Sequence, residues 1–235
     1  MQLIPPDREI ELKEAFFSGA NHGFFVEVGA GDPHQESQSF HLERLGWTGV
    51  LIEPLDEFVE KLRLHRSGQV FNVACSSPEN AGKSMPLFVA GVLSSLERDK
   101  MAAGAKILSV RNVATKTLDQ ILIEAKVPSG IDFLSVDVEG HELSVLRGFD
   151  FQRWRPRLIF VEDHVANHEK IKFMNGVGYR LIRHTHYNGW YIPCEARADI
   201  TWADRWRLLR KYVLGLPIRK FRDASRRRRR LRAAS

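Results

Sequence analysis

The sequence predicts an α/β fold with a mostly parallel sheet, a C-terminal antiparallel hairpin on that sheet, and a basic extension after it. Three observations support this prediction. Apolar runs of strand length alternate with segments whose apolar residues recur every three or four positions. Several of the apolar runs end in an acidic residue, and the charge changes sign near residue 200. Strands that alternate with helices form a mostly parallel sheet that helices cover on both faces.

The first part of the chain supplies three of the expected strands and two helices. Residues 23–30 (GFFVEVGA) and 49–54 (GVLIEP) are apolar runs that contain or end beside an acid. Residues 69–77 (QVFNVACSS) form the third run. Between these strands, residues 37–45 and 55–65 carry apolar side chains at helical spacing, which predicts one helix in each connection.

The rest of the body continues the alternation. The expected elements are a short strand or loop at 85–89, a helix at 117–125, a strand at 131–140 that leads into a helix, a strand at 157–164 and a hairpin over 179–192. We place the hairpin turn at Asn188-Gly189, because this dipeptide favours the tight turns that join antiparallel strands.

Charge divides the chain into parts. The segment from Arg205 to Arg232 contains thirteen Lys or Arg residues and one acid, which gives it +12. The whole chain carries +6, so the remainder carries −6. We therefore expect a helical lead-in at 1–20, one globular domain at 21–197 and a basic amphipathic extension at 198–235.

The composition also predicts a cellular location. Cys75 and Cys194 are too few for a disulfide framework, and the N-terminal residues lack the apolar core of a signal peptide. No run approaches the roughly 18 apolar residues that a membrane-spanning helix needs. These features indicate a protein of the cytoplasm with reduced thiols.

Acidic residues gather where the predicted strands end. In an open parallel sheet, ligands bind at the carboxyl ends of the strands, near the point where the strand order reverses. The strand ends carry Glu27, Glu53, Asp137 with Glu139, and Glu162. Such a crevice would repel a pyrophosphate and suits a cationic or hydroxyl-bearing ligand.

The segment FFVEVGAGD at 24–32 narrows the choice of ligand. Gly29 and Gly31 are present, but the third glycine of a dinucleotide-binding turn is replaced by His34, which weakens a dehydrogenase interpretation. The carboxylate of Glu27 fits an amino group, and an acid placed as Glu53 is typically hydrogen-bonded to ribose hydroxyls. We expect Asn72 and Cys75, at the end of the third strand, to lie near an adenine. An amino acid, a ribose and an adenine without phosphate describe S-adenosylmethionine.

Several segments in fixed order resemble the FkbM family of S-adenosylmethionine-dependent methyltransferases. They are FFVEVGAGD, SQSFHLERLGWTGVLIEP, NVACSS, TLDQIL, IDFLSVDVEGHELSVLRGF and FVEDH, within residues 22–193. The resemblance implies a seven-stranded Rossmann-like methyltransferase fold over 21–197 and O-methylation of a sugar, glycan or natural product. Pro33 stands where the family commonly has another glycine.

Catalysis of methyl transfer to a hydroxyl needs a base, or a metal ion that lowers the pKa of the acceptor. Asp137, Glu139 and His141 follow the fourth main strand, and His164 follows the fifth. Two alternatives stay open. Asp137, Glu162 and His164 can hold Mg²⁺ or Mn²⁺, or else His141 or His164 acts as the base without metal.

The basic extension begins with an amphipathic segment, TWADRWRLLRKYVLGLP, followed by RRRRRLR. Trp202, Trp206, Leu209 and Val213 recur at helical spacing among basic residues. This pattern predicts a helix on an anionic membrane surface, at the inner face of the membrane. The alternatives are a helix that packs on the body or on a partner, and a tail that binds nucleic acid in an RNA methyltransferase. The net acidic body disfavours nucleic acid.

Overall fold

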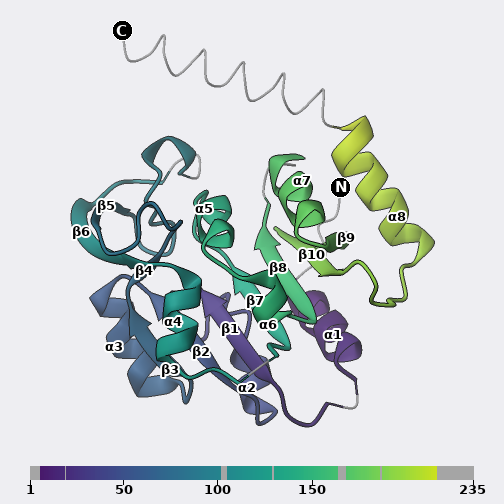
Figure 1. Cartoon of the computed structure of the whole chain (residues 1–235), viewed down its shortest axis with the longest axis horizontal. Coiled ribbons are helices and arrows are strands. Elements are labelled where there is room, and N and C mark those ends of the chain that lie inside the picture. The colour runs from purple at the N-terminus through teal and green to yellow at the C-terminus, as the bar shows by residue number, and fades with distance from the viewer. Residues whose placement is uncertain are drawn as a thin grey trace, which may run out of the picture.

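The computed structural model describes residues 6–18, 20–101, 105–128, 130–163, 168–185 and 187–215. Its centre is a seven-stranded sheet in the order β3-β2-β1-β7-β8-β10-β9 (Figure 1). The strands are β1 (Phe24–Val28), β2 (Thr48–Glu53), β3 (Gln69–Asn72), β7 (Phe133–Val136), β8 (Leu158–Glu162), β9 (Tyr179–Thr185) and β10 (Asn188–Pro193). The predicted α/β fold with a mostly parallel sheet is confirmed.

The topology of this sheet fixes where a ligand can bind. β1 pairs in parallel with β2 on one side and with β7 on the other, so the strand order reverses between β1 and β7. β10 is antiparallel to both of its neighbours, β8 and β9. Counted along the chain, the strands of this sheet lie in the order 3-2-1-4-5-7-6, as expected for a Rossmann-like methyltransferase fold. The crevice for a ligand therefore opens at the carboxyl ends of β1 and β7.

A second, three-stranded sheet stands beside the carboxyl ends of the main sheet. It consists of β4 (Ala74–Cys75), β6 (Ser109–Lys116) and β5 (Ser84–Val89), with β5 and β6 antiparallel. The predicted strand at 69–77 is divided at Val73, where the chain leaves the main sheet for the smaller one. We did not predict β6, because its side chains are mostly exposed and lack a clear apolar alternation.

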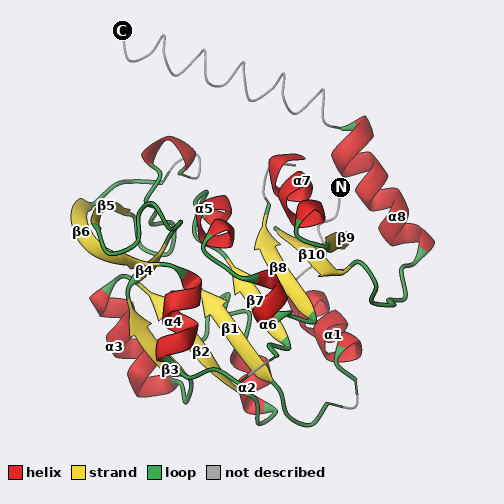
Figure 2. Ribbon diagram, viewed as in Figure 1, coloured by secondary structure: helices red, strands yellow, loops and turns green. Residues whose placement is uncertain are grey.

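Helices cover both faces of the main sheet (Figure 2). They are α1 (Pro6–Phe16), α2 (Phe40–Arg44), α3 (Asp56–His65), α4 (Leu118–Glu124), α5 (Glu142–Arg147), α6 (Phe151–Trp154), α7 (His168–Gly176) and α8 (Trp202–Leu209). A 3₁₀ turn spans Arg98–Lys100, and a π-helical turn, Arg210–Leu214, continues α8. None of the described helices has the length and hydropathy needed to cross a membrane.

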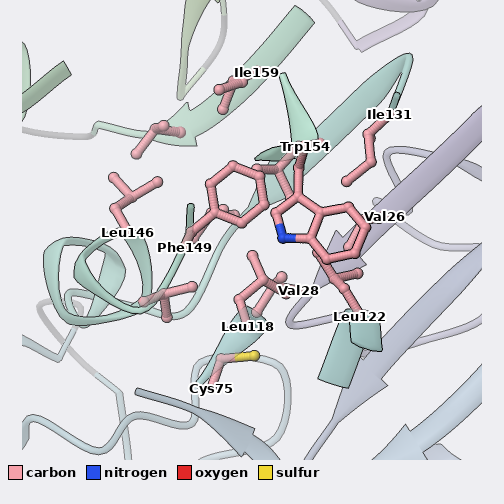
Figure 3. Close-up of a cluster of buried hydrophobic side chains, with 14 of the residues drawn as sticks. Val26, Val28, Cys75, Leu118, Leu122, Ile131, Leu146, Phe149, Trp154 and Ile159 are labelled. Atoms are coloured by element: carbon pink, nitrogen blue, oxygen red, sulfur yellow. The ribbon is translucent and has the colours of Figure 1, made fainter. Parts of the chain in front are cut away.

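Period-two alternation along the strands builds two apolar layers. Val26 and Val28 of β1 point into the layer that Figure 3 shows, together with Leu118 of α4 and Trp154 of α6. Phe25, the residue before Val26, points into the opposite layer, which the N-terminal helices cover. Burial of both faces explains why the strands appear in the sequence as nearly continuous apolar runs.

The predicted hairpin turn at Asn188-Gly189 is wrong. Both residues lie in β10, where Asn188 pairs with Thr185 and Gly189 pairs with His184. The buried Asn188 side chain donates a hydrogen bond to Glu9 at 3.1 Å. A β-carbon on Gly189 would lie 3.0 Å from the Tyr191 ring, so this glycine serves packing and not a turn.

The predicted helix at 37–45 is also shorter than expected. α2 begins at Phe40, because the three preceding residues are used to bind the buried carboxylate of Glu27. These three residues form hydrogen bonds with Glu27 in place of a first helical turn. They thereby attach the segment after β1 to β1 itself.

Candidate active site

A pocket lies at the carboxyl ends of β1, β2, β4 and β7, beside the reversal of strand order. The empty space within it, open solvent included, is about 1010 Å³. Its floor is formed by the turn after β1 and by the end of β2, and residues 91–96 form a roof over it. A pocket at this edge of a parallel sheet is a candidate binding site for a small molecule or a cofactor.

The turn after β1 and the end of β7 approach each other closely. Gly29 has a φ of +80°, and a β-carbon on it would lie 1.8 Å from the main-chain oxygen of Asp137. The Asp137 N–H donates a hydrogen bond to the main-chain oxygen of Val28 at 3.0 Å. No residue with a side chain fits at position 29 without a shift of one of these two segments.

Glu53 joins the ends of β1 and β2. One carboxylate oxygen accepts a hydrogen bond from the Gly31 N–H at 3.0 Å, and the other accepts one from the Leu55 N–H at 2.9 Å. Burial raises the pKa of Glu53 from its ordinary value of 4.5 to about 7. Each oxygen keeps a lone pair, so the ionised carboxylate can accept further hydrogen bonds from hydroxyls in the pocket.

Glu27 also lines the pocket, but its carboxylate already has partners. It accepts hydrogen bonds from the hydroxyl groups of Ser37 and Ser39, at 3.0 Å and 2.5 Å, and from the Gln38 N–H at 2.6 Å. The buried guanidinium of Arg66 lies 3.9 Å away. Glu27 therefore holds the segment after β1 in place, in addition to forming part of the wall.

The two residues predicted near the adenine lie in different places. Cys75 is buried in the pocket wall with Val73 and Ala74, and burial raises the pKa of its thiol, so it is no nucleophile. Asn72 is exposed and does not line the pocket; its side-chain amide donates to Asp56 at the start of α3. The apolar wall around Cys75, and not the Asn72 amide, is therefore the part of the pocket against which an adenine ring can pack.

Three carboxylates converge beside the pocket. Oxygen atoms of Asp137, Glu139 and Glu162 all lie within 4.8 Å of one another. Burial and the neighbouring carboxylates raise the pKa of Asp137 well above its ordinary range, and the pKa of Glu162 rises to about 9 mainly through burial. Burial and the repulsion among these groups therefore prevent the cluster from ionising fully, so that it keeps a proton near neutral pH.

Glu139 and Gly140 form the turn that brings this cluster together. Glu139 has a φ of +51°, a conformation that non-glycine residues rarely adopt. The Gly140 N–H donates to the Glu142 carboxylate at 2.7 Å, and Glu142 forms a buried ion pair with Lys170 at 2.8 Å. Glu142 therefore stabilises the turn, and Asp137 and Glu139 of the cluster line the pocket.

His141 lines the pocket, yet both of its ring nitrogens are engaged. Nε2 lies 2.9 Å from the Ser76 hydroxyl, and Nδ1 lies 3.0 Å from the Glu97 carboxylate. Because the Asn80 amide donates to Ser76 at 3.0 Å, the Ser76 hydroxyl is free to donate to Nε2. Burial lowers the pKa of His141, which favours this neutral tautomer. The ring thus links the roof to β4, an arrangement that does not suit a proton-accepting base.

The roof and the residue after it, Glu97, supply two contacts that we did not predict. The Ser95 hydroxyl donates to the main-chain oxygen of Glu139 at 2.7 Å, and Glu97 binds His141 as described above. These two contacts fasten the roof to the turn after β7. The sequence GVLSSLE offers no periodicity or motif that points to them. His164, predicted as a base and as a metal ligand, lies outside the described residues.

The charge of the pocket identifies the kind of ligand that fits. The described residues that line it include six acids and no Lys or Arg. A bound phosphate would lack a cationic partner there, whereas an apolar wall near Cys75 and the carboxylate of Glu53 suit a nucleoside without phosphate. This site, on a sheet of this topology, defines a Rossmann-like methyltransferase.

The comparison with known protein families also identifies a methyltransferase. The model of the methyltransferase FkbM domain matches residues 19–181, and the chain belongs to this family. The match includes β1, β2, β7 and β8 and therefore every acidic residue of the pocket and cluster described above. A search of curated proteins found no match.

Proposed function

We propose that this methyltransferase transfers the methyl group of S-adenosylmethionine to a hydroxyl oxygen of a sugar, a glycan or a natural product. The observation that carries the proposal is the pocket at the strand reversal, where acids face an apolar wall and no described lining residue is Lys or Arg. The family implies the donor, and the chemistry of the lining residues fits it.

Different residues of the pocket would bind different parts of the donor. Glu53 would accept hydrogen bonds from the ribose hydroxyls, which its remaining lone pairs allow. The wall of Val73, Ala74 and Cys75 would pack against the adenine. Glu27, at the other end, would supply negative charge beside the amino group. The donor supplies an electrophilic methyl group, so the protein contributes mainly alignment and proton removal.

Asp137 is the base that we assign to the acceptor hydroxyl, with Glu139 beside it. A raised pKa brings a carboxylate closer to the working pH, where general-base catalysis is most effective. Glu162 lies within the same cluster and can share the proton that Asp137 removes. Both ring nitrogens of His141 already have hydrogen-bond partners, Ser76 and Glu97, which disfavours this histidine as the base.

The same three carboxylates offer the oxygen ligands that Mg²⁺ and Mn²⁺ prefer. A divalent cation held there would lower the pKa of the acceptor hydroxyl and would replace the protons of the cluster. Of the predicted ligands, Asp137 and Glu162 belong to this group, and His164 lies outside the described residues; Glu139 is a candidate ligand that the sequence did not predict.

The reaction can be tested with methyl-labelled S-adenosylmethionine and a panel of acceptors that contains free sugars, oligosaccharides and lipid-linked glycans. We expect label to enter an acceptor as an acid-stable methyl ether. Asp137→Asn should remove this activity, and the control Asp99→Asn, at an exposed position, should not. Label found in nitrogen or in nucleic acid, and not in an ether, would contradict O-methylation.

A further inference from the structure

Helix α8 is docked on the body by one of its faces. Its first turn is closed by Thr201, whose hydroxyl accepts from the Asp204 N–H at 3.1 Å. The buried carboxylate of Asp204 receives two hydrogen bonds from Arg183 of β9, at 3.0 Å and 2.9 Å. In the π-helical turn that follows, the buried Tyr212 hydroxyl donates to the carboxylate of Asp163. These polar contacts fix the orientation of the helix.

The opposite face of α8 is apolar and uncovered. Trp202 is 80% exposed and Trp206 is 49% exposed, while Leu209 and Val213 are 44% and 57% exposed. Their spacing of four, three and four residues places them in one stripe along the helix. A helix on the surface of a protein normally packs its large apolar residues against the core. Here they face outward, and an exposed apolar stripe of this kind indicates a binding surface.

Cationic residues border this stripe. Arg205 follows Trp202 by three positions and Arg210 follows Trp206 by four, so both lie beside the stripe, and both are exposed. Residues 201–215 contain four Lys or Arg and one acid, and residues 216–235, outside the described part, contain nine and one. The net charges are therefore +3 and +8.

We propose that this face of α8 binds the surface of an anionic lipid bilayer. Tryptophan and aliphatic side chains of the stripe would enter the boundary between headgroups and acyl chains, while the bordering arginines would meet lipid phosphates. A second copy of the chain fits less well, because two such faces would bring rows of like charge together. Nucleic acid would satisfy the arginines but leave the apolar stripe in water.

The docking of α8 relates this surface to the pocket. The Lys211 ammonium donates to the main-chain oxygen of Asp163 at 2.7 Å, and Asp163 directly follows Glu162 of the acidic cluster. The turn that continues α8 is thus anchored at the carboxyl end of β8, and the pocket lies at the carboxyl ends of other strands of the same sheet. The lipid-binding proposal itself does not depend on methyl transfer.

The test uses the full chain and vesicles of phosphatidylcholine with or without phosphatidylglycerol. We expect strong co-sedimentation with the anionic vesicles, weak co-sedimentation with the neutral ones, and loss of binding as salt is raised. The triple variant W202S/W206S/L209S should lower the partition coefficient by about tenfold or more. The matched control L45S/L64S/I123S changes three exposed apolar residues elsewhere on the body and should bind as the wild type does.

Fluorescence gives a second readout that needs no variant. Trp47, Trp154 and Trp190 are buried, so Trp202 and Trp206 are the two tryptophans exposed to water. Addition of anionic vesicles should shift their emission to shorter wavelength and protect them from acrylamide.

Four outcomes would overturn the proposal. The first is absence of binding to anionic vesicles at low salt, with no change in emission. The second is equal binding by the stripe variant and its control, which would assign binding to the tail charge alone. The third is a concentration-dependent dimer that the stripe variant abolishes, with no effect on lipid binding, since the stripe would then be an interface between copies. Binding of RNA that survives in the stripe variant, without lipid binding, would assign the arginines to nucleic acid.

Discussion

The main-chain oxygen of Asp137 lies 1.8 Å from the place that a β-carbon on Gly29 would occupy. This close approach joins the turn after β1, where we propose that the donor binds, to the carboxyl end of β7, where we propose that the acceptor binds. Backbone packing, which resists small displacements, thus sets the distance between these two regions.

Gly29→Ala should damage the site and the fold together. The new β-carbon would collide with the Asp137 carbonyl, and the φ of +80° would add strain. We expect a loss of roughly 3 kcal/mol or more in the free energy of unfolding. The control Gly82→Ala has a similar φ of +76° but nothing within 4 Å, so it should cost only about 1–2 kcal/mol. Equal losses in urea unfolding would show that the contact is unimportant.

Cofactor affinity should depend on pH through Glu53. The ionised carboxylate accepts ribose hydrogen bonds better than the protonated form, and its pKa is about 7 in the empty pocket. The affinity for S-adenosylmethionine should therefore rise about tenfold between pH 6 and pH 8. Calorimetry in buffers of different ionisation enthalpy should detect proton release at pH 6, and a flat profile would remove Glu53 from the ribose site.

The stability of the cofactor-free protein should change with pH in the opposite sense. Glu53 has a folded-state pKa above its ordinary value of 4.5, so its protonated form favours the folded state. This contribution is complete below pH 4.5 and is lost as the pH rises through about 7. Relative to wild type, Glu53→Gln should therefore gain stability between pH 5 and pH 8. A constant difference in melting temperature would contradict the raised pKa.

Ser95→Ala should loosen the roof without changing the floor of the pocket. It removes the hydrogen bond to the main-chain oxygen of Glu139, which is worth about 1 kcal/mol. We expect faster cofactor release and a several-fold weaker affinity, measured by stopped-flow fluorescence and calorimetry. The control Ser109→Ala lies at an exposed position of β6 and should release the cofactor at the wild-type rate.

Asp137→Asn should separate catalysis from binding. Loss of the base is expected to lower turnover by about 10²–10⁴-fold, and cofactor affinity should change much less. Turnover should be compared in excess chelator and after addition of Mg²⁺ or Mn²⁺. Loss in chelator with recovery on addition would support the metal held by Asp137, Glu139 and Glu162. Full activity in chelator would leave Asp137 as a metal-free base.

Local sequence patterns predicted the parts of the site that depend on single strand ends. Gly29, Gly31, Glu53 and Asp137 each follow an apolar run directly, so parallel pairing was sufficient to bring them together. The contacts of the roof could not be predicted in this way. Ser95 and Glu97 meet partners that lie 44 residues further along the chain, and such long-range contacts leave no periodic signal.

Residues with several possible partners were also difficult to assign. His141 follows a strand, as a base would, but the positions of Ser76 and Glu97 decide its role. Asn188-Gly189 favours a turn locally, but the buried contact with Glu9 and the packing of Tyr191 place it in a strand. In both cases tertiary contacts outweigh the local preference.

Calorimetric titration with S-adenosylmethionine tests the assignment of the pocket most directly. We expect one molecule to bind per chain, and Glu53→Gln to weaken binding by about 1–3 kcal/mol through lost charge-assisted hydrogen bonds. Glu57→Gln, an exposed position on α3 paired with Arg111, should bind as the wild type does. NAD⁺ should not bind, because no described residue lining the pocket is Lys or Arg. Absence of S-adenosylmethionine binding by the folded protein, or equal binding of NAD⁺, would contradict the assignment.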